Sequence, residues 1–286
     1  MTAADPVRLS VVIPAYNEEA YLPATLASLR RQEVPGGFEV LVVDNASTDE
    51  TANVAARLGA RVVREEAAGV CAARQRGTEE ARGDIVVSTD ADTVHPVGWL
   101  AHLAAHFDAD DVVAVAGPCR YADPPWWARV FPTGWFAAIA AVHALTGRVL
   151  YITATNVAFR RDGFPGYDTR LTQGGDEVDL LRRLRRQGRV VWDAGNPVLT
   201  SSRRMDQGLL HTLLVSYGYH YALNLALNRL RPGRTMHVAP VIRQEQAATS
   251  RRLRRRWRMA LLGGASGALL LSRHRDRSAL RPPVRP

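Results

Sequence analysis

The stretch Leu9-Ser-Val-Val-Ile-Pro-Ala-Tyr-Asn-Glu18 joins an apolar run to a polar turn near the start of the chain. The run is rich in β-branched residues and ends at a proline, which is typical of a buried strand. Leu22, Leu26 and Leu29 then recur at helical spacing, and Phe38–Asp44 follows as a second strand-like run. This alternation predicts βαβ units that build a mostly parallel sheet.

The alternation continues to about residue 94. We predict a helix that starts at the capping-box sequence Ser47-Thr-Asp-Glu50 and ends at Gly59, a strand over Arg61–Arg64, a helix over Val70–Ala81 and a strand over Asp84–Thr89. In such sheets ligands bind at the carboxyl ends of the strands. The expected site therefore lies where the turns after the first, second and fourth strands meet: Pro14–Glu18, Asp44–Asp49 and Asp90–Thr93.

Beyond residue 95 the pattern is coarser. The predicted elements are a helix over Trp99–Phe107, a strand over Val112–Ala116, a loop rich in proline and tryptophan over 118–134, a helix over Trp135–Leu145, a strand over Ala154–Phe159, a helix over Asp176–Gln187, a strand over Val190–Trp192 and a long helix over Met205–Leu230.

Charge is distributed unevenly along the 286 residues. The basic residues are 37 arginines and no lysine, against 28 acids. Residues 1–250 hold 26 arginines and 27 acids, a net charge of −1, whereas residues 251–286 hold 11 arginines and one acid, a net charge of +10. The body is nearly neutral, and its charge gives no reason to expect nucleic-acid binding.

The ends of the chain bear on its location. The first apolar run is too short for a signal peptide, and Cys71 and Cys119 form neither a metal-binding spacing nor a disulfide framework. We therefore expect a cytoplasmic protein. The apolar run Met259–Leu271 is shorter than the roughly 20 residues that span a bilayer. With the arginines of 251–277 it suits the surface of an anionic membrane, although a solvated basic arm or a helix packed on the body fits equally.

The sequence Asp90-Ala-Asp92 follows a predicted buried strand directly, so both carboxylates are expected at the ligand edge of the sheet. Mg²⁺ or Mn²⁺ bound by few carboxylates commonly completes its shell with substrate phosphate oxygens. We therefore interpret this D-x-D motif as a metal–phosphate site. A second copy, Asp108-Ala-Asp110, follows a helix, and we interpret it as solvated surface.

For the other polar groups, a functional and a structural interpretation are both open. Asp44-Asn45 follows a strand and suits either a nucleoside contact or an ordinary turn. Arg74, near a helix start, suits either a diphosphate or the surface. Asp176 and Glu177 open a helix, where acids favour the helix dipole and where one of them would also suit a general base. The glycine signatures of dinucleotide and P-loop sites are missing from the sequence.

Taken together, these segments resemble the family 2 glycosyltransferases, which use nucleotide-diphospho-sugar donors and have the glycosyltransferase-A fold. The resemblance runs from about Leu9 to Arg204 and rests on six motifs in order: Val11-Val-Ile-Pro-Ala-Tyr-Asn-Glu18, Val42-Val-Asp-Asn-Ala-Ser-Thr-Asp49, Gly69-Val-Cys-Ala-Ala-Arg-Gln-Arg-Gly77, Thr89-Asp-Ala-Asp92, Thr155-Asn156 and Gly175-Asp-Glu-Val-Asp-Leu180.

The resemblance implies roles for individual residues. A nucleotide pocket is implied for Pro14, Tyr16, Glu18, Asp44, Asn45, Ser47 and Asp49, with Arg74 near the diphosphate or base, Asn156 near the donor, Asp90 near the ribose or sugar and Asp92 on a Mg²⁺ or Mn²⁺ ion. The catalytic base is implied to be Glu177 by position, with Asp176 as the alternative, because the family's usual Glu-Asp order is reversed here. Thr155 stands where the family usually has glycine, and Ser202-Arg203-Arg204 suits a phosphate contact.

The resemblance further implies an α/β fold of glycosyltransferase-A type: a Rossmann-like, mostly parallel sheet flanked by helices. We expect a catalytic domain over 1–204, with a nucleotide half over about 8–94 and an acceptor half over about 95–204, a helical extension over 205–250 and the arginine-rich tail over 251–286. The Gln-x-x-Arg-Trp motif of processive synthases is missing after the base, which favours one transfer per acceptor.

The expected function is an inverting glycosyltransferase whose acceptor is lipid-linked or a small molecule. Two alternatives stay open: a retaining transferase on the same fold, and a membrane-surface binding protein with a vestigial sugar-nucleotide pocket.

Overall fold

A computed structural model describes residues 7–171, 176–203 and 205 of the chain. The chain divides into two units, Met1–Gln244 and Glu245–Pro286, and all described residues belong to the first unit. The predicted helix over Met205–Leu230 lies outside the described residues except for Met205, and so do the predicted extension and arginine-rich tail.

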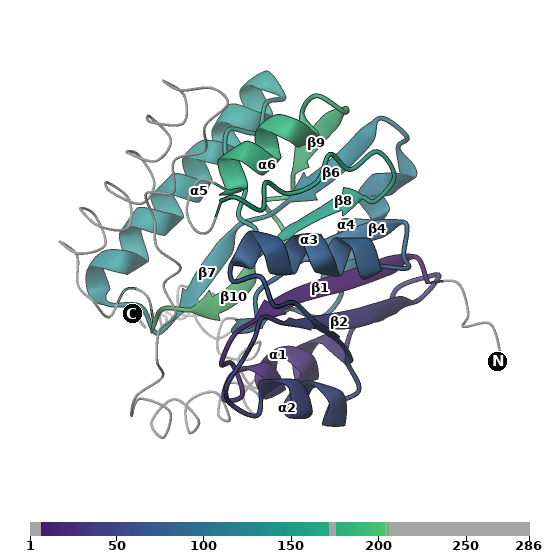
Figure 1. Ribbon diagram of the computed structural model, residues 1–286. Helices are drawn as coiled ribbons and strands as arrows, with labels where there is room; N and C mark the ends of the chain where they lie inside the picture. The colour runs from purple at the N-terminus through teal and green to yellow at the C-terminus, as the bar shows by residue number, and fades with distance from the viewer. Residues whose placement is uncertain (1–6, 172–175, 204, 206–286) are drawn as a thin grey trace, which may run out of the picture. The chain divides into compact units, whose positions relative to one another are not determined.

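A seven-stranded sheet in the order β3-β2-β1-β4-β8-β6-β9 forms the centre of the described part (Figure 1). Its strands are β1 (Leu9–Ala15), β2 (Phe38–Asp44), β3 (Arg61–Arg64), β4 (Ile85–Ser88), β6 (Val112–Ala116), β8 (Val157–Arg160) and β9 (Arg189–Trp192). All neighbouring pairs are parallel except those of β8, which runs antiparallel to β4 and β6. The predicted α/β class with a mostly parallel sheet is therefore confirmed.

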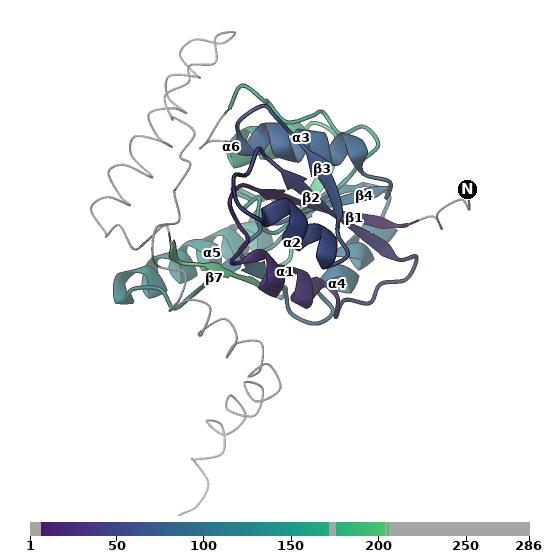
Figure 2. The same cartoon turned by 60° about the horizontal axis from the view of Figure 1, so that its bottom comes forward.

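Helices cover both faces of this sheet, as Figure 2 shows. One face packs against α1 (Leu22–Leu29), α2 (Thr51–Arg57) and α4 (Trp99–Ala105), the last of which continues into a short 3-10 helix, His106–Asp108. The other face packs against α3 (Val70–Glu80), α5 (Trp126–Thr146) and α6 (Asp176–Leu184).

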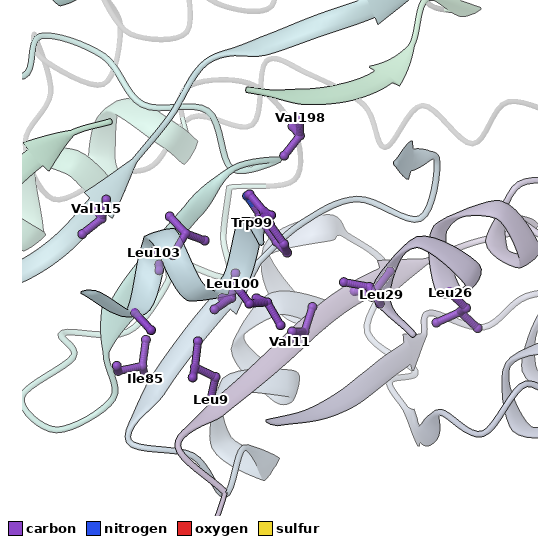
Figure 3. Packing of buried hydrophobic residues seen from close by; sticks show 14 of the residues in the cluster. Leu9, Val11, Leu26, Leu29, Ile85, Trp99, Leu100, Leu103, Val115 and Val198 are labelled. Atoms are coloured by element: carbon purple, nitrogen blue, oxygen red, sulfur yellow. The ribbon is translucent and has the colours of Figure 1, made fainter. Parts of the chain in front are cut away.

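Alternation along β1 divides the core between the two faces. Leu9 and Val11 point toward α4 and α1, where Trp99 and Leu29 pack beside them (Figure 3). Val12 belongs to the opposite cluster, under α3. Because strand side chains alternate between faces, an apolar run such as β1 can be buried on both sides.

A small second sheet in the order β5-β10-β7 flanks the central one. Its strands are β5 (Thr93–Val94), β10 (Val198–Ser201) and β7 (Cys119–Ala122). The backbone N–H of Ser201 donates to the carbonyl of Asp92 at 3.2 Å, and this places the end of β10 beside the D-x-D motif.

Two local predictions are wrong. The expected loop over 118–134 instead forms β7 and the first turns of α5, which continues through Pro132 although proline removes one backbone donor. The expected capping box at Ser47 does not form, because the Ser47 hydroxyl accepts from the backbone of Asn17 at 3.0 Å and α2 begins at Thr51 without a side-chain cap.

His95 is buried between β5 and α4. Its ring is 2.9 Å from the Ser28 hydroxyl and 2.8 Å from the Thr89 hydroxyl, and it stacks on Trp99. Burial lowers the pKa of His95 to about 3, so the ring is neutral near pH 7. Its role is to connect β4 to the core.

Gly77 provides the first prediction. A Cβ at this position of α3 would lie 2.3 Å from Cγ1 of Val12 and 2.9 Å from Cγ2 of Val43, so the helix lies directly on the sheet there. We expect Gly77→Ala to destabilise the protein by about 1–3 kcal/mol through overpacking. Urea unfolding measures this.

Gly134 is the matched control. It also lies inside a helix, α5, but a Cβ there would meet nothing within 4 Å. Gly134→Ala is therefore expected to be neutral or to stabilise by about 0.5–1 kcal/mol. Equal unfolding midpoints for the two variants would contradict the close packing of α3.

Candidate active site

Three strand ends meet at one edge of the central sheet. In the β1–β2 register Ala15 lies opposite Asp44, and Asn45 N–H donates to the carbonyl of Ala15 at 2.8 Å. Thr89, which follows β4, donates its backbone N–H to the carbonyl of Val12. The turns that carry the predicted nucleotide and metal residues therefore lie side by side, as the rule for parallel sheets predicts.

Arg74 joins two of the predicted acids. Its guanidinium is buried and donates from Nη2 to Oδ1 of Asp90 at 2.8 Å and from Nη1 to Oδ2 of Asp176 at 3.1 Å. Burial alone would lower the pKa of Arg74, but the two carboxylates hold that pKa above its ordinary value. The turn after β4 and the start of α6 are thereby tied to α3.

Thr155 completes the surroundings of Asp90. Its hydroxyl donates to Oδ2 of Asp90 at 2.5 Å, while Oδ1 accepts from Arg74. The threonine that departs from the family's glycine thus makes a direct contact with a site carboxylate.

Asn156 is fully buried, and its amide bonds inside the protein. Its Oδ1 accepts from the Trp99 indole at 2.9 Å, and its Nδ2 donates to the carbonyls of Pro118 and Asn196 at 3.0 and 2.9 Å. Asn156 therefore connects α4 with the loops beside β7 and β10. This position does not bring its side chain to the acids of the site.

The two acids at the start of α6 differ in burial and in their partners. Asp176 is buried and paired with Arg74, whereas Glu177 is partly exposed. Burial of the carboxyl, followed by the neighbouring charge of Asp176, raises the pKa of Glu177 to about 8, although Arg74 acts in the opposite direction. The proton of Glu177 therefore exchanges near neutral pH.

The β1 and β2 turns are held together by side-chain hydrogen bonds. Asp44 is buried and accepts from the backbone N–H of Ser47 at 3.2 Å. Asp49 accepts from the backbone N–H groups of Thr51 and Glu19 at 3.0 and 3.3 Å.

The other predicted pocket residues lie beside these turns. Asn45 donates to the carbonyls of Glu65 and Ala67 and accepts from Gly69 N–H at 2.9 Å, so its side chain fixes the loop before α3. Pro14 and Tyr16 are half-buried at the end of β1.

Arg203 lies among the acids of the candidate site, a position that the sequence pattern did not predict. It follows β10, bonds both carboxylate oxygens of Glu18, and lies 3.1 Å from Oδ2 of Asp92. Its guanidinium also stacks over the Tyr21 ring at 4.7 Å. The resemblance suggested only a phosphate contact for Ser202-Arg203-Arg204. The carboxylate partners of Arg203 lie more than 100 positions away in the sequence, so no local pattern could indicate them.

The side chains available as metal ligands show whether a metal ion fits the site. Among the described residues no group of three or more His, Cys, Asp or Glu side chains could hold a metal ion. The edge instead presents carboxylates one residue apart, Asp90 and Asp92, with Thr200 Oγ1 3.4 Å from Oδ1 of Asp92. This set fits Mg²⁺ or Mn²⁺ that takes most of its ligands from phosphate and water. Both carboxylates already have partners: Asp90 contacts Arg74 and Thr155, and Asp92 contacts Thr200 and Arg203.

Comparisons with known proteins agree with this architecture. A mannosyltransferase from Pyrobaculum calidifontis, solved with GDP-Man and Mn²⁺, aligns with a TM-score of 0.62 over 98% of this chain and 84% of that one, at 21% identity. Glucosyl-3-phosphoglycerate synthase from Mycobacterium tuberculosis, solved with Mn²⁺, UDP-glucose and phosphoglyceric acid, aligns with a TM-score of 0.51 at 25% identity over 73% of this chain and 79% of that one. The fold is of glycosyltransferase-A type.

The family follows from the sequence. The family model described as glycosyl transferase family 2 matches residues 10–166, more than half of the chain. An uncharacterized glycosyltransferase of Mycobacterium tuberculosis is 44% identical over 124 residues, 43% of this chain and 55% of that protein. The chain thus spans about half the length of this relative. It belongs to glycosyl transferase family 2, which confirms the resemblance.

The environment of Glu177 makes stability depend on pH. A glutamate in an unfolded chain titrates near about 4.3, below the folded pKa. The stability that protonated Glu177 contributes is therefore complete below about pH 4.3 and is lost as the pH rises toward about 8. We expect Glu177→Gln, which stays uncharged, to gain on the wild type by up to about 1.4 kcal/mol per pH unit in this window.

Urea unfolding at pH 5, 6, 7 and 8 measures this gain. Glu33→Gln, at an exposed position outside the site, is the control and should follow the wild type. The assignment fails if Glu177→Gln also follows the wild-type pH profile.

Proposed function

We propose that this chain is an inverting, divalent-metal-dependent glycosyltransferase that moves one sugar from a nucleoside-diphosphate donor to an acceptor hydroxyl or phosphate. The observation that carries the proposal is the shared guanidinium of Arg74. It sets Asp90, from the predicted donor motif, and Asp176, beside the predicted base, on two nitrogens of one side chain. Donor-binding and proton-accepting groups must be this close if one displacement is to use both.

The proposed donor site is the edge where β1, β2 and β4 end. Asp44 would accept hydrogen bonds from the nucleobase, and Asp90 would face the ribose or sugar. The relatives solved with UDP-glucose and GDP-Man support a nucleotide-sugar donor of one of these base types. The diphosphate then lies next to Asp92.

Asp92, assisted by Asp90, would hold Mg²⁺ or Mn²⁺ together with the donor's phosphate oxygens. When bound, such an ion stabilises the charge that develops on the departing nucleoside diphosphate. The Mn²⁺ in the two solved relatives supports this requirement.

Glu177 is the proposed general base. Its carboxylate takes the proton of the acceptor hydroxyl while that oxygen forms a bond to the anomeric carbon. The bond between this carbon and the diphosphate oxygen breaks in the same step, so the configuration inverts and the proton remains on Glu177. A base with a pKa of about 8 suits proton transfer near neutral pH, and Asp176 is already bound by Arg74.

Two substitutions test these roles together. Glu177→Gln removes the base but keeps the shape of the side chain, so we expect transfer to fall by about 10²–10⁴-fold while donor affinity stays near that of the wild type. Asp92→Asn is expected to lower both the transfer rate and the affinity for the donor. Donor-consumption rates and calorimetry with UDP or GDP plus Mn²⁺ measure the two properties.

Three outcomes would count against this function. Normal turnover by Glu177→Gln would reject the base. Retained anomeric configuration in the product, read by NMR, would show a retaining transferase. A wild-type protein that binds neither nucleotide with Mn²⁺ would have a vestigial pocket.

We also propose that the enzyme works at the inner surface of a membrane on a lipid-linked acceptor. By length and composition alone, α5 is the described helix that could cross a membrane, and it is mostly exposed. Trp126, Val130 and Leu145 are 79%, 74% and 85% exposed, and the helix contains no acid. Exposed apolar groups on α5 suit an anionic lipid layer, and so does the arginine-rich sequence of 251–277.

A relative supports this acceptor class. The undecaprenyl-phosphate 4-deoxy-4-formamido-L-arabinose transferase of Pseudomonas fluorescens is 35% identical over 106 residues, 34% of this chain and 31% of that protein. Its name specifies a lipid phosphate acceptor.

Vesicle sedimentation tests the membrane contact. We expect the full chain to bind vesicles that contain phosphatidylglycerol and not pure phosphatidylcholine. Replacing Arg254, Arg255 and Arg256 by Gln should weaken binding by about 1 kcal/mol per arginine. The control replaces three exposed arginines of the body, Arg57, Arg82 and Arg186, and should bind as the wild type does. Equal losses in both variants would contradict a role for the tail.

A further inference from the structure

Arg203 occupies a position between two of the site's acids. Its Nη1 donates to Oε2 of Glu18 at 2.9 Å, its Nη2 bonds the other oxygen of Glu18, and Nη2 also lies 3.1 Å from Oδ2 of Asp92. Burial would lower the pKa of Arg203, but Asp92 and Glu18 keep that pKa above its ordinary value. The guanidinium therefore stays positively charged at the D-x-D motif.

The small sheet determines this position. β10 is bound to the turn after β4 through Ser201 N–H to the Asp92 carbonyl and through Thr200 Oγ1, 3.4 Å from Oδ1 of Asp92. The chain then continues for two residues to Arg203. The backbone that brings Arg203 to Asp92 is thus anchored on Asp92 itself, whereas the long Arg203 side chain has several rotatable bonds of its own.

A divalent cation on Asp92 would compete with Arg203 for the same carboxylate. Two positive groups at one oxygen repel each other, so a metal ion there weakens the contact between Arg203 and Asp92. A diphosphate bound together with such an ion would provide a second anionic partner for the guanidinium. A guanidinium binds carboxylate and phosphate through the same planar fork of N–H groups.

We propose that Arg203 is a positioning residue that alternates between two partners. Without donor it neutralises Asp92 and Glu18, and when donor and metal bind it releases Asp92 and binds the diphosphate. This inference rests on the proposed function, since it assumes that a metal–diphosphate complex binds at Asp92.

The proposal predicts effects of opposite sign in one variant. In Arg203→Ala the competitor for Asp92 is gone, so Mn²⁺ alone should bind about threefold or more tightly than to the wild type. The diphosphate loses its guanidinium partner, so UDP or GDP in the presence of saturating Mn²⁺ should bind about 10- to 100-fold more weakly. Electron paramagnetic resonance of free Mn²⁺ and calorimetry of the nucleotides measure the two affinities.

Arg61→Ala is the matched control. Arg61 likewise bridges two carboxylates, Glu39 and Glu80, and its side chain is 28% exposed against 21% for Arg203. It lies away from the candidate site, on β3, so its loss should change neither affinity. Arg203→Lys serves as a second variant. It keeps a positive charge near Asp92 but lacks the fork, and it should leave Mn²⁺ affinity near the wild-type value while weakening nucleotide binding.

A thermal-shift measurement adds a readout without nucleotide. Mn²⁺ should raise the melting temperature of Arg203→Ala more than that of the wild type, because a ligand stabilises in proportion to its affinity.

The possible results separate the two proposals. If the wild type binds UDP or GDP with Mn²⁺ but Arg203→Ala loses affinity for Mn²⁺ as well, Arg203 supports a fixed site and the exchange of partners is rejected. Unchanged nucleotide affinity in Arg203→Ala and Arg203→Lys would reject it too. If the wild type binds neither nucleotide with Mn²⁺, both the proposed function and this inference are overturned.

Discussion

The buried guanidinium of Arg74 is the constraint on which the candidate site depends. The desolvation free energy of this buried charge is offset because Asp90 and Asp176 bind two of its nitrogens. These two acids are 86 residues apart in the sequence. Breaking such a buried pair leaves a charge inside the protein, which is far more costly than losing a surface ion pair. The turn after β4 and the first turn of α6 are therefore fixed relative to each other through α3.

Arginine is the only cationic side chain apart from histidine in this protein, and the site uses its geometry. A lysine offers a point charge on a flexible stem, whereas the guanidinium fork can hold two carboxylates in fixed directions. Arg74 holds Asp90 and Asp176 in this way. Arg203 holds Glu18 and Asp92. The two guanidinium groups thus offset the repulsion between the neighbouring carboxylates of the site.

The sequence predicted what local patterns encode. The strands at Arg61–Arg64 and Val112–Ala116 are as expected, because apolar residues and flanking turn residues are local signals. The strand predicted from Leu9 also forms, but it continues past its expected end at Pro14 to Ala15. The acidic turns were placed correctly at one edge, because parallel sheets put their carboxyl ends together.

What sequence reasoning missed depends on distant partners. β5, β7 and β10 are short, and among the strands that the structure describes they pair only with one another. The contact of Thr155 with Asp90 joins residues 65 positions apart. Ser47 has the spacing of a helix cap, but Asn17 on the neighbouring turn donates to its hydroxyl instead. No window of sequence contains both members of such pairs.

The reversed order of Asp176 and Glu177 has a structural reading. At the start of α6, position 176 points to Arg74, and position 177 is the acid whose proton is held near neutral pH. If position determines role, the exchange of the two acids keeps a carboxylate in each place and alters only the reach of each. The shorter side chain then lies at the buried ion pair, where Arg74 can extend to meet it. The longer one lies at the partly exposed position, which is that of the proposed base. On this argument the reversed order changes the length of the side chain at each position by one methylene and keeps a carboxylate at both positions.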